Sequence, residues 1–223
     1  MKKVYSALAV LVTIIIPFFL MMTSIRILLN PFFLDYEYSL PNFPPDEFGF
    51  STQDRLYWGK ISLDYLTNRA GIEFLGDLQF QDGTPFYNER ELSHMLDVKN
   101  LIQKALVVWY CAISVLLGLY IWSRAKKWSD FFWRGVSRGG LLTVGVIVAI
   151  LIGVVLNFEA LFTQFHHLFF TGDTWLFYTN DSLIRLFPEK LWSDAFIFMG
   201  VFTLTGAILL MLPGMKFMKK KPK

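Results

Sequence analysis

Long apolar runs alternate with mixed polar stretches along this chain. Four runs, at about residues 4 to 25, 105 to 122, 140 to 156 and 195 to 212, are each long enough to cross a hydrocarbon core of about 30 Å as a helix. The third run contains no charged residue. The pattern predicts an all-α membrane protein with four transmembrane helices, in which a single integral membrane domain spans residues 1 to 223.

Composition and charge refine this prediction. The chain is 54% hydrophobic, which is outside the range of soluble globular domains. Residues 30 to 99 hold twelve Asp and Glu against five Lys and Arg, and residues 159 to 194 hold five against two. Basic residues instead flank the other ends of the four runs: Lys2, Lys3, Arg124, Lys126, Lys127, Arg134, Arg138, Lys216, Lys219, Lys220, Lys221 and Lys223. By the positive-inside rule both termini are cytoplasmic, residues 30 to 99 form an extracytoplasmic cap and residues 159 to 194 form an extracytoplasmic loop.

Two capping patterns predict helices in and after the cap. Ser51 and Asp54 open a helical pattern that ends before Gly71. Asn88 followed by Glu91 resembles a capping box, which would start a helix at residue 89 that continues into the second apolar run.

The third apolar run carries small residues at intervals of four. Gly145, Ala149 and Gly153 lie on one helix face. Such a face lets another helix approach closely, so we expect it to be a packing surface.

The three histidines of the chain lie beside the outer ends of two runs. His94 precedes the second run by eleven residues, and His166 follows the third by ten, next to His167. If both helices continue straight, His94 and His166 rise about 15 Å beyond the apolar core, because each residue adds about 1.5 Å. This equal depth is what a shared site requires, with the cap over it or one segment folded back toward the membrane.

Acidic residues accompany these histidines. Glu91 and Asp97 lie three residues to either side of His94, which places them on its helix face. Glu159 precedes His166 by seven residues and would share its side of a continuing helix. A carboxylate at this spacing is suited to orient an imidazole and fix its tautomer.

Two further residues are candidates for substrate binding. Arg26 ends the first run, where it either extends to the lipid headgroups or contacts the phosphate of a lipid substrate. Trp175 lies in the second outer loop and is typical of an anchor at the membrane interface.

The residues alone leave three interpretations open. The first is acid/base chemistry on a lipid or lipid-linked substrate, since imidazole titrates near neutral pH. The second is a metal or haem site with some of the histidines and carboxylates as ligands, although adjacent helical histidines diverge by about 100°. The third is a set of interfacial histidines that only satisfy hydrogen bonds. The chain contains no glycine-rich phosphate loop, G-x-S-x-G or H-E-x-x-H motif.

A resemblance favours the first interpretation. The segments ERELSHMLDVK at 89 to 99, FHHLFF at 165 to 170, DTW at 173 to 175 and LFP at 186 to 188 are similar to an integral membrane family of formerly unknown function. That family includes the bacterial lipoprotein intramolecular transacylases, and the resemblance extends over essentially the whole chain.

This resemblance implies an acyltransferase of the bacterial cytoplasmic membrane whose active site faces outward. Such an enzyme moves the sn-2 acyl chain of a diacylglyceryl-cysteine lipoprotein to the cysteine's own α-amino group and leaves a lyso-form lipoprotein. The resemblance implies His94 and His166 as catalytic residues and His167 as a supporting one. Its partners would be the diacylated lipoprotein and membrane lipid, with no nucleic acid, cofactor or metal.

With this resemblance, we expect a mechanism that needs no protein nucleophile. His94, with Asp97 or Glu91 stabilising its cation, would take the proton of the attacking amine, and His166 would protonate the departing glycerol oxygen or bind the oxyanion. The alternatives are a non-catalytic assembly or binding protein, a metal-dependent enzyme and a lipid hydrolase.

Overall fold

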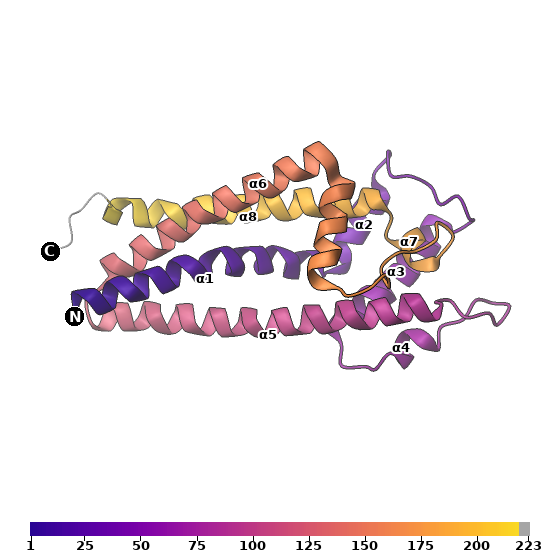
Figure 1. Cartoon of the computed structure of the whole chain (residues 1–223), viewed down its shortest axis with the longest axis horizontal. Helices are drawn as coiled ribbons and strands as arrows, with labels where there is room; N and C mark the ends of the chain where they lie inside the picture. Colours follow the sequence, from indigo (N-terminus) through magenta and orange to yellow (C-terminus); the bar gives the residue numbers. More distant parts are fainter. Residues whose placement is uncertain (219–223) are drawn as a thin grey trace. The chain divides into compact units, whose positions relative to one another are not determined.

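The apolar runs form four long helices. The structure, a computed structural model, describes residues 1 to 218. Its helices are α1 Lys2–Leu28, α2 Pro31–Ser39, α3 Thr52–Thr67, α4 Glu73–Gly76, α5 Glu89–Ala125, α6 Ser129–Phe169, α7 Ser182–Leu186 and α8 Glu189–Met218 (Figure 1). Within these residues, β pairing is limited to one isolated bridge between Gln79 and Pro85. The all-α prediction with four candidate membrane-spanning helices, α1, α5, α6 and α8, is confirmed.

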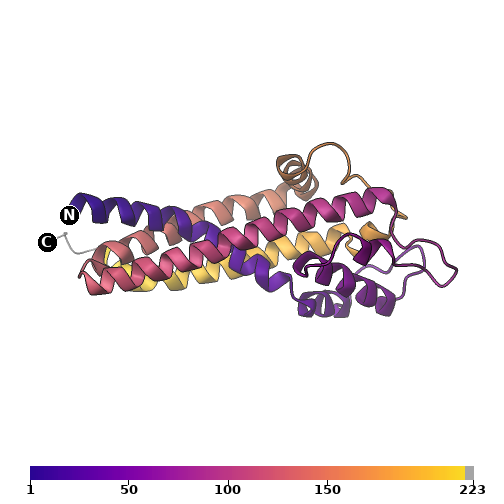
Figure 2. The same ribbon diagram turned by 90° about the horizontal axis from the view of Figure 1, so that it is seen from below.

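The chain divides into two units. The first unit contains Met1–Arg26, Leu106–Leu156 and the residues from Phe196 on, and the second contains Ile27–Ala105 and Asn157–Ala195. Parts of α1, α5, α6 and α8 lie side by side in the first unit (Figures 1 and 2). The shorter helices α2, α3, α4 and α7 belong to the second unit, together with all three histidines.

Glycines bring α6 close to α1 in the first unit. A Cβ atom on Gly135 would lie 2.6 Å from the Ala9 carbonyl oxygen, and one on Gly139 would lie 2.6 Å from Ile16 Cβ. Val12 and Ile16 are buried at this contact. Any side chain at these two glycines would therefore push the two helices apart.

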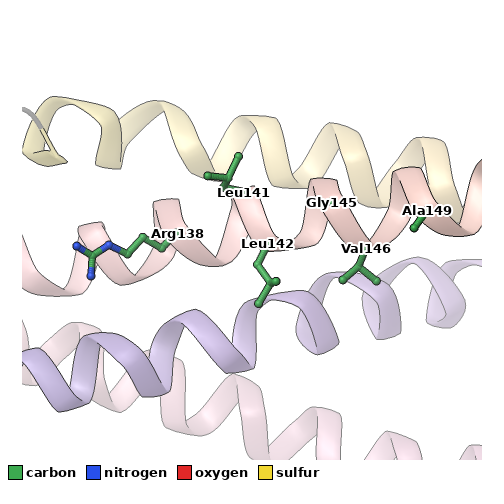
Figure 3. Close-up of a pocket in the computed structure, with 6 residues that line it drawn as sticks. All are labelled: Arg138, Leu141, Leu142, Gly145, Val146 and Ala149. Carbon is green, nitrogen blue, oxygen red and sulfur yellow. The ribbon is translucent and has the colours of Figure 1, made fainter.

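The small-residue face expected at Gly145, Ala149 and Gly153 makes no close helix contact at Gly145 within residues 1 to 218. Nothing lies within 4 Å of a Cβ atom built on Gly145. Gly145 and Ala149 instead line a cavity of about 600 Å³ along α6, together with Arg138, Leu141, Leu142 and Val146 (Figure 3). The packing prediction was wrong at Gly145 because α1 makes its close approach to α6 at Gly135 and Gly139, nearer the start of α6.

The second unit has its own aromatic and aliphatic core. Tyr65, Leu75, Phe86, Tyr87, Met95, Leu183 and Leu186 form this buried cluster. The predicted helix after Ser51 is confirmed as α3: the Ser51 hydroxyl accepts from the Asp54 N–H, and the Asp54 carboxylate accepts from the Ser51 N–H. This reciprocal cap satisfies two N–H groups that a helix start otherwise leaves free.

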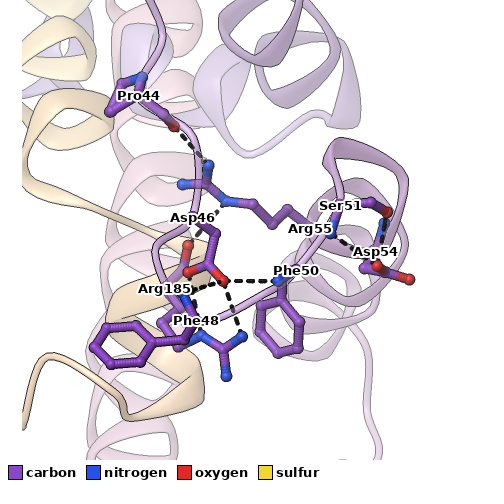
Figure 4. A network of polar contacts seen from close by, with 8 residues as sticks. All are labelled: Pro44, Asp46, Phe48, Phe50, Ser51, Asp54, Arg55 and Arg185. Atoms are coloured by element: carbon purple, nitrogen blue, oxygen red, sulfur yellow. Dashed lines mark hydrogen bonds and ion pairs between the residues drawn. The ribbon is translucent and has the colours of Figure 1, made fainter.

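Arg185 and Arg55 hold the irregular segment before α3 in place through hydrogen bonds. Both oxygens of Asp46 accept hydrogen bonds from Arg185, at 3.1 and 2.9 Å, and one also accepts from the N–H groups of Phe48 and Phe50 (Figure 4). Arg55 donates to the carbonyl oxygens of Arg185 and Pro44. Burial alone raises the pKa of Asp46, but the hydrogen bonds and charge of Arg185 and the two N–H groups outweigh it and lower the pKa below its ordinary value.

A second carboxylate in this unit is buried without such support. Glu37 is 2% exposed, and its Oε2 atom has no hydrogen-bond partner. Burial, followed by the neighbouring Asp194, raises the pKa of Glu37 to about 7, although the charge of Lys190 opposes the shift. Lys190 is itself paired with Asp194.

We expect Asp46→Asn to lower the melting temperature of the detergent-solubilised protein by several degrees. The substitution removes the charge partner of Arg185, and hydrogen bonds to charged groups contribute about 1.5–3 kcal/mol. Asp35→Asn is the matched control, because Asp35 pairs with Lys60 on the surface, where such pairs contribute about 0–1 kcal/mol. Equal effects of the two substitutions would contradict the assignment.

Glu37 should give stability a specific pH dependence. Because its pKa is raised in the folded state, its contribution is fully present below the ordinary value of 4.5 and is lost as the pH rises through about 7. Thermal melts across this range should show Glu37→Gln gaining stability over the wild type above pH 7. Glu47→Gln, an exposed control, should follow the wild-type curve. Parallel curves for all three proteins would rule out the effect.

Candidate active site

The start of α5 is fixed by a buried carboxylate. The predicted capping box is present: Asn88 Oδ1 accepts from the Glu91 N–H at 3.0 Å, and Glu91 Oε2 accepts from the Asn88 N–H at 2.8 Å. The other oxygen, Oε1, accepts from the Leu183 N–H in α7 at 2.6 Å. Glu91 is 1% exposed, so both of its oxygens are bonded inside the protein. This carboxylate holds the first turn of α5, which leads to His94, against α7.

The segment that carries His166 follows an interruption of α6. Asn157 has φ −163° and ψ 89°, which is not helical, and its Oδ1 accepts from the Ala160 N–H at 2.9 Å. Asn157 therefore caps a new helical segment that continues to Phe169. The helix therefore does not continue straight beyond residue 156, because the short polar side chain of Asn157 supports a new helix start at that point.

The structure brings His94 and His166 together. Their ring centroids are 5.9 Å apart with an interplanar angle of 27°. The two residues are 6% and 7% exposed, and Phe170 and Phe177 pack edge-on against His94 at 5.0 and 5.4 Å. Two imidazoles from distant parts of the sequence thus share one aromatic enclosure within the second unit.

Trp175 and His167 complete the enclosure. The Trp175 ring stacks on His166 at 4.8 Å, and His167 packs edge-on against Trp175 at 5.3 Å. Trp175 is buried and His167 is exposed. His167 therefore contacts Trp175 from outside, whereas His94 and His166 form the interior pair.

A hydrogen bond fixes the tautomer of His166. Its Nδ1 atom lies 2.8 Å from the carbonyl oxygen of Phe162, one helical turn earlier. A carbonyl oxygen only accepts, so Nδ1 must carry the proton, and the lone pair of the neutral ring lies on Nε2. His166 is thus a hydrogen-bond acceptor, and a candidate base, at Nε2.

The surroundings of His94 differ from those of His166. Within residues 1 to 218, the Nδ1 atom of His94 is buried without a hydrogen-bond partner, as are Trp175 Nε1 and Thr174 Oγ1. Buried polar atoms without partners are uncommon, and such atoms at a candidate site indicate a place for a ligand's own polar groups. The sequence already predicted His94 as a catalytic residue, whereas Thr174 stood there only within the DTW segment at 173 to 175, without a role of its own.

The predicted carboxylate partners do not reach the imidazoles. Both oxygens of Glu91 bond to backbone N–H groups, while Asp97 and Glu159 are exposed. Among residues 1 to 218, no hydrogen bond or ion pair joins any of the three to a histidine. The expectation that Glu91 or Asp97 orients His94 was therefore wrong, because the helix cap and α7 use both oxygens of Glu91 and the Asp97 side chain is exposed. Within the same residues, no group of three or more His, Cys, Asp and Glu is arranged to hold a metal ion.

Arg26 lies in the first unit, at the end of its α1 segment. Its predicted contact with substrate stays a prediction.

A comparison with protein-family models identifies the family of this chain. The family model "Lipoprotein intramolecular transacylase Lit" matches residues 10 to 192. The chain belongs to the lipoprotein intramolecular transacylase family. Members of this family are acyltransferases, so the chain is a membrane enzyme of that class and the predicted resemblance is confirmed.

Similar proteins support the transacylase fold. An uncharacterized protein of Aquifex aeolicus is 29% identical over 226 residues, which covers 99% of each chain. The membrane integral transacylase of Bacillus cereus is 21% identical, with a TM-score of 0.70 and 98% of each chain covered. A variant of that enzyme with one histidine replaced by alanine is 23% identical at the same TM-score, with 98% of this chain and 96% of the other covered. These structures show that the chain shares the fold of the Bacillus cereus enzyme.

We expect Glu91→Gln to lower both the melting temperature and the activity. Gln places an N–H₂ group against one of the two backbone N–H donors, and a buried unsatisfied group costs about 1–3 kcal/mol. Glu89→Gln, at an exposed position of the same helical turn, is the matched control. Thermal melts and acyl-transfer assays on purified protein test this. A Glu91→Gln protein as stable and active as the Glu89→Gln protein would contradict the role of the carboxylate.

Proposed function

We propose that this enzyme moves the sn-2 acyl chain of a diacylglyceryl-cysteine lipoprotein to the α-amino group of the same cysteine, which leaves a lyso-form lipoprotein. The observation that carries the proposal is the buried pair of His94 and His166, with ring centroids 5.9 Å apart. The reaction requires one group that removes a proton from nitrogen and one that stabilises charge on oxygen. Two imidazoles in one enclosure supply both functions.

His166 is the proposed base. Its Nδ1–H is used by the Phe162 carbonyl, so its Nε2 lone pair is free to accept a proton. When Nε2 is protonated, the same carbonyl remains a partner for Nδ1–H and stabilises the imidazolium. From the carboxylates beside His94 in the sequence, we had expected the opposite roles, with His94 as the base and His166 as the acid or oxyanion donor.

His94 is the proposed hydrogen-bond donor to the oxyanion. Its Nδ1 atom has no partner, and an orphan acceptor is more readily tolerated than an orphan N–H. The neutral ring then carries its proton on Nε2, from which it donates. Two imidazolium cations this close would repel each other, so the pair works with one proton at a time.

The proposed steps balance with a single transferred proton. The neutral α-amine attacks the ester carbonyl carbon, a C–N bond forms, and His166 Nε2 takes the amine proton. The tetrahedral oxyanion accepts hydrogen bonds from His94 and from Trp175 Nε1–H, which has no partner in the described part of the chain. The C–O bond to glycerol then breaks, and His166 returns the proton to the glycerol oxygen. Because amine and ester belong to one molecule, correct positioning alone contributes greatly to the rate.

The remaining candidates have supporting roles in this proposal. His167 holds the indole of Trp175 in place from outside. Arg26 would bind oxygen atoms of the substrate headgroup, since guanidinium is suited to such acceptors. Glu91 positions α5, whereas Asp97 and Glu159 have no contact that supports a part in the reaction.

The proposed location is the bacterial cytoplasmic membrane, with both termini cytoplasmic and the histidines facing outward. The distribution of Lys and Arg along the chain supports this orientation. The acidic excess in residues 30 to 99 and 159 to 194 agrees with it. An outward site would meet diacylated lipoproteins after their export.

Side-chain replacements should separate the two roles. His94→Ala and His166→Ala should each abolish the lyso-form product, whereas His167→Ala should retain most of the activity. His94→Gln should recover part of the activity, because an amide N–H can still donate to the oxyanion. His166→Gln should recover none, because an amide cannot accept a full proton.

Mass spectrometry of lipoprotein N-termini from cells that express each variant is the measurement. Lyso-form product at the wild-type level from both alanine variants would contradict the proposed function. Release of free fatty acid without an N-acyl product from the wild-type enzyme would instead support a hydrolase. Recovery of activity in His166→Gln but not in His94→Gln would reverse the two roles.

A further inference from the structure

A cavity that the acyl-transfer steps do not use lies next to the histidine pair. It has a volume of about 440 Å³ and is lined by Arg90 of α5 and by Asp173, Thr174 and Leu176 of the following loop. Its volume is within the range of ligand-binding pockets, about 300–1,000 Å³. All of its lining residues belong to the second unit.

Three polar groups of its lining are available to a ligand. Thr174 Oγ1 is buried and has no hydrogen-bond partner. Arg90 donates through Nη1 to the Leu176 carbonyl oxygen at 3.0 Å and lies over the Tyr178 ring, which leaves its other N–H groups free of hydrogen bonds within residues 1 to 218. In the same part of the chain, the Asp173 side chain accepts no hydrogen bond and forms no ion pair.

The loop that lines this cavity also contacts the histidine pair. Trp175 turns its ring onto His166, while Thr174 and Leu176, its neighbours on either side, line the cavity. Consecutive residues of one loop therefore contribute to both sites.

Helix α5 sets the distance between them. Arg90 and His94 are four residues apart and lie on one face of the helix, about 6 Å apart along its axis. An extended chain covers about 3.3–3.6 Å per residue. Measured along α5, Arg90 in the cavity thus lies about two residues of extended peptide from His94.

We propose that this cavity binds the peptide of the lipoprotein substrate, at the first residues after the acylated cysteine. The proposal rests on the proposed function. The Thr174 hydroxyl and the free N–H groups of Arg90 would donate to peptide carbonyl oxygens, and the Asp173 carboxylate would accept from a peptide N–H. An acyl chain in this cavity would instead leave the buried Thr174 hydroxyl without a hydrogen-bond partner, which is unfavourable. The cavity would then act as the specificity subsite that distinguishes a lipoprotein from a free diacylated lipid.

Two synthetic substrates test this subsite with the purified full-length enzyme in detergent. One is dipalmitoylglyceryl-cysteine followed by a short peptide, and the other is dipalmitoylglyceryl-cysteine amide, which has no peptide. Thr174→Val removes the hydroxyl at constant shape, and Arg90→Ala removes the guanidinium. Each should lower kcat/KM for the lipopeptide about tenfold more than for the amide, with the loss expressed mainly in KM.

Matched controls keep the test specific. Thr174→Ser retains the hydroxyl and should keep the wild-type ratio between the two substrates. Arg69→Ala removes an exposed charge of the same unit that does not line the cavity, and it should also keep that ratio. Equal losses on both substrates in Thr174→Val and Arg90→Ala, or no loss on either, would overturn the subsite.

A binding measurement separates this inference from the proposed function. Wild-type enzyme that forms no N-acyl product from either substrate would contradict the proposed function. The affinity of the lipopeptide for the His166→Ala protein, measured by microscale thermophoresis, addresses the cavity independently of turnover. About tenfold weaker binding after adding Thr174→Val would support the subsite, and unchanged binding would overturn it.

Discussion

The second unit depends on one buried carboxylate at the start of α5. Glu91 accepts hydrogen bonds from Asn88 and from Leu183, 92 residues later in the chain, so it closes the helix cap and attaches α7 with the same group. Asp181, two residues before Leu183, accepts from Asn88 Nδ2 and from the Tyr178 N–H, which fixes the end of the loop that carries Trp175. The histidine of α5 and the loop that covers the histidine of α6 are therefore held by one polar connection.

The proposed chemistry uses two imidazoles with different roles, one as a base and one as a hydrogen-bond donor. His166 is bonded at Nδ1 to a carbonyl oxygen and offers a lone pair at Nε2, whereas His94 lacks a partner at Nδ1. The surrounding Phe170, Phe177 and Trp175 rings exclude water, which strengthens hydrogen bonds to charge that develops on the substrate. No charged side chain is needed beside the pair, since one proton moves from amine to base and on to the leaving oxygen.

Local sequence signals predicted the helices well, and long-range contacts limited the rest. The apolar runs and the capping pairs at Ser51 and Asn88 follow from neighbouring residues, and the structure confirms them. The break at Asn157 depends on a backbone conformation that a strongly apolar helix does not reveal. The partner of Glu91 lies in α7, so spacing along α5 suggested a role beside His94 instead. The cavity residue Thr174 lies in the DTW segment at 173 to 175, but only the fold places its hydroxyl at a buried position.

The tautomers of the two buried histidines provide the most direct test of this account. Nitrogen-15 NMR of the histidine-labelled enzyme, with signals assigned by single-histidine variants, reports which ring nitrogen carries the proton at neutral pH. We expect a neutral His166 with its proton on Nδ1 and a neutral His94 with its proton on Nε2. A His166 ring protonated on Nε2, with Nδ1 as the acceptor, would contradict it.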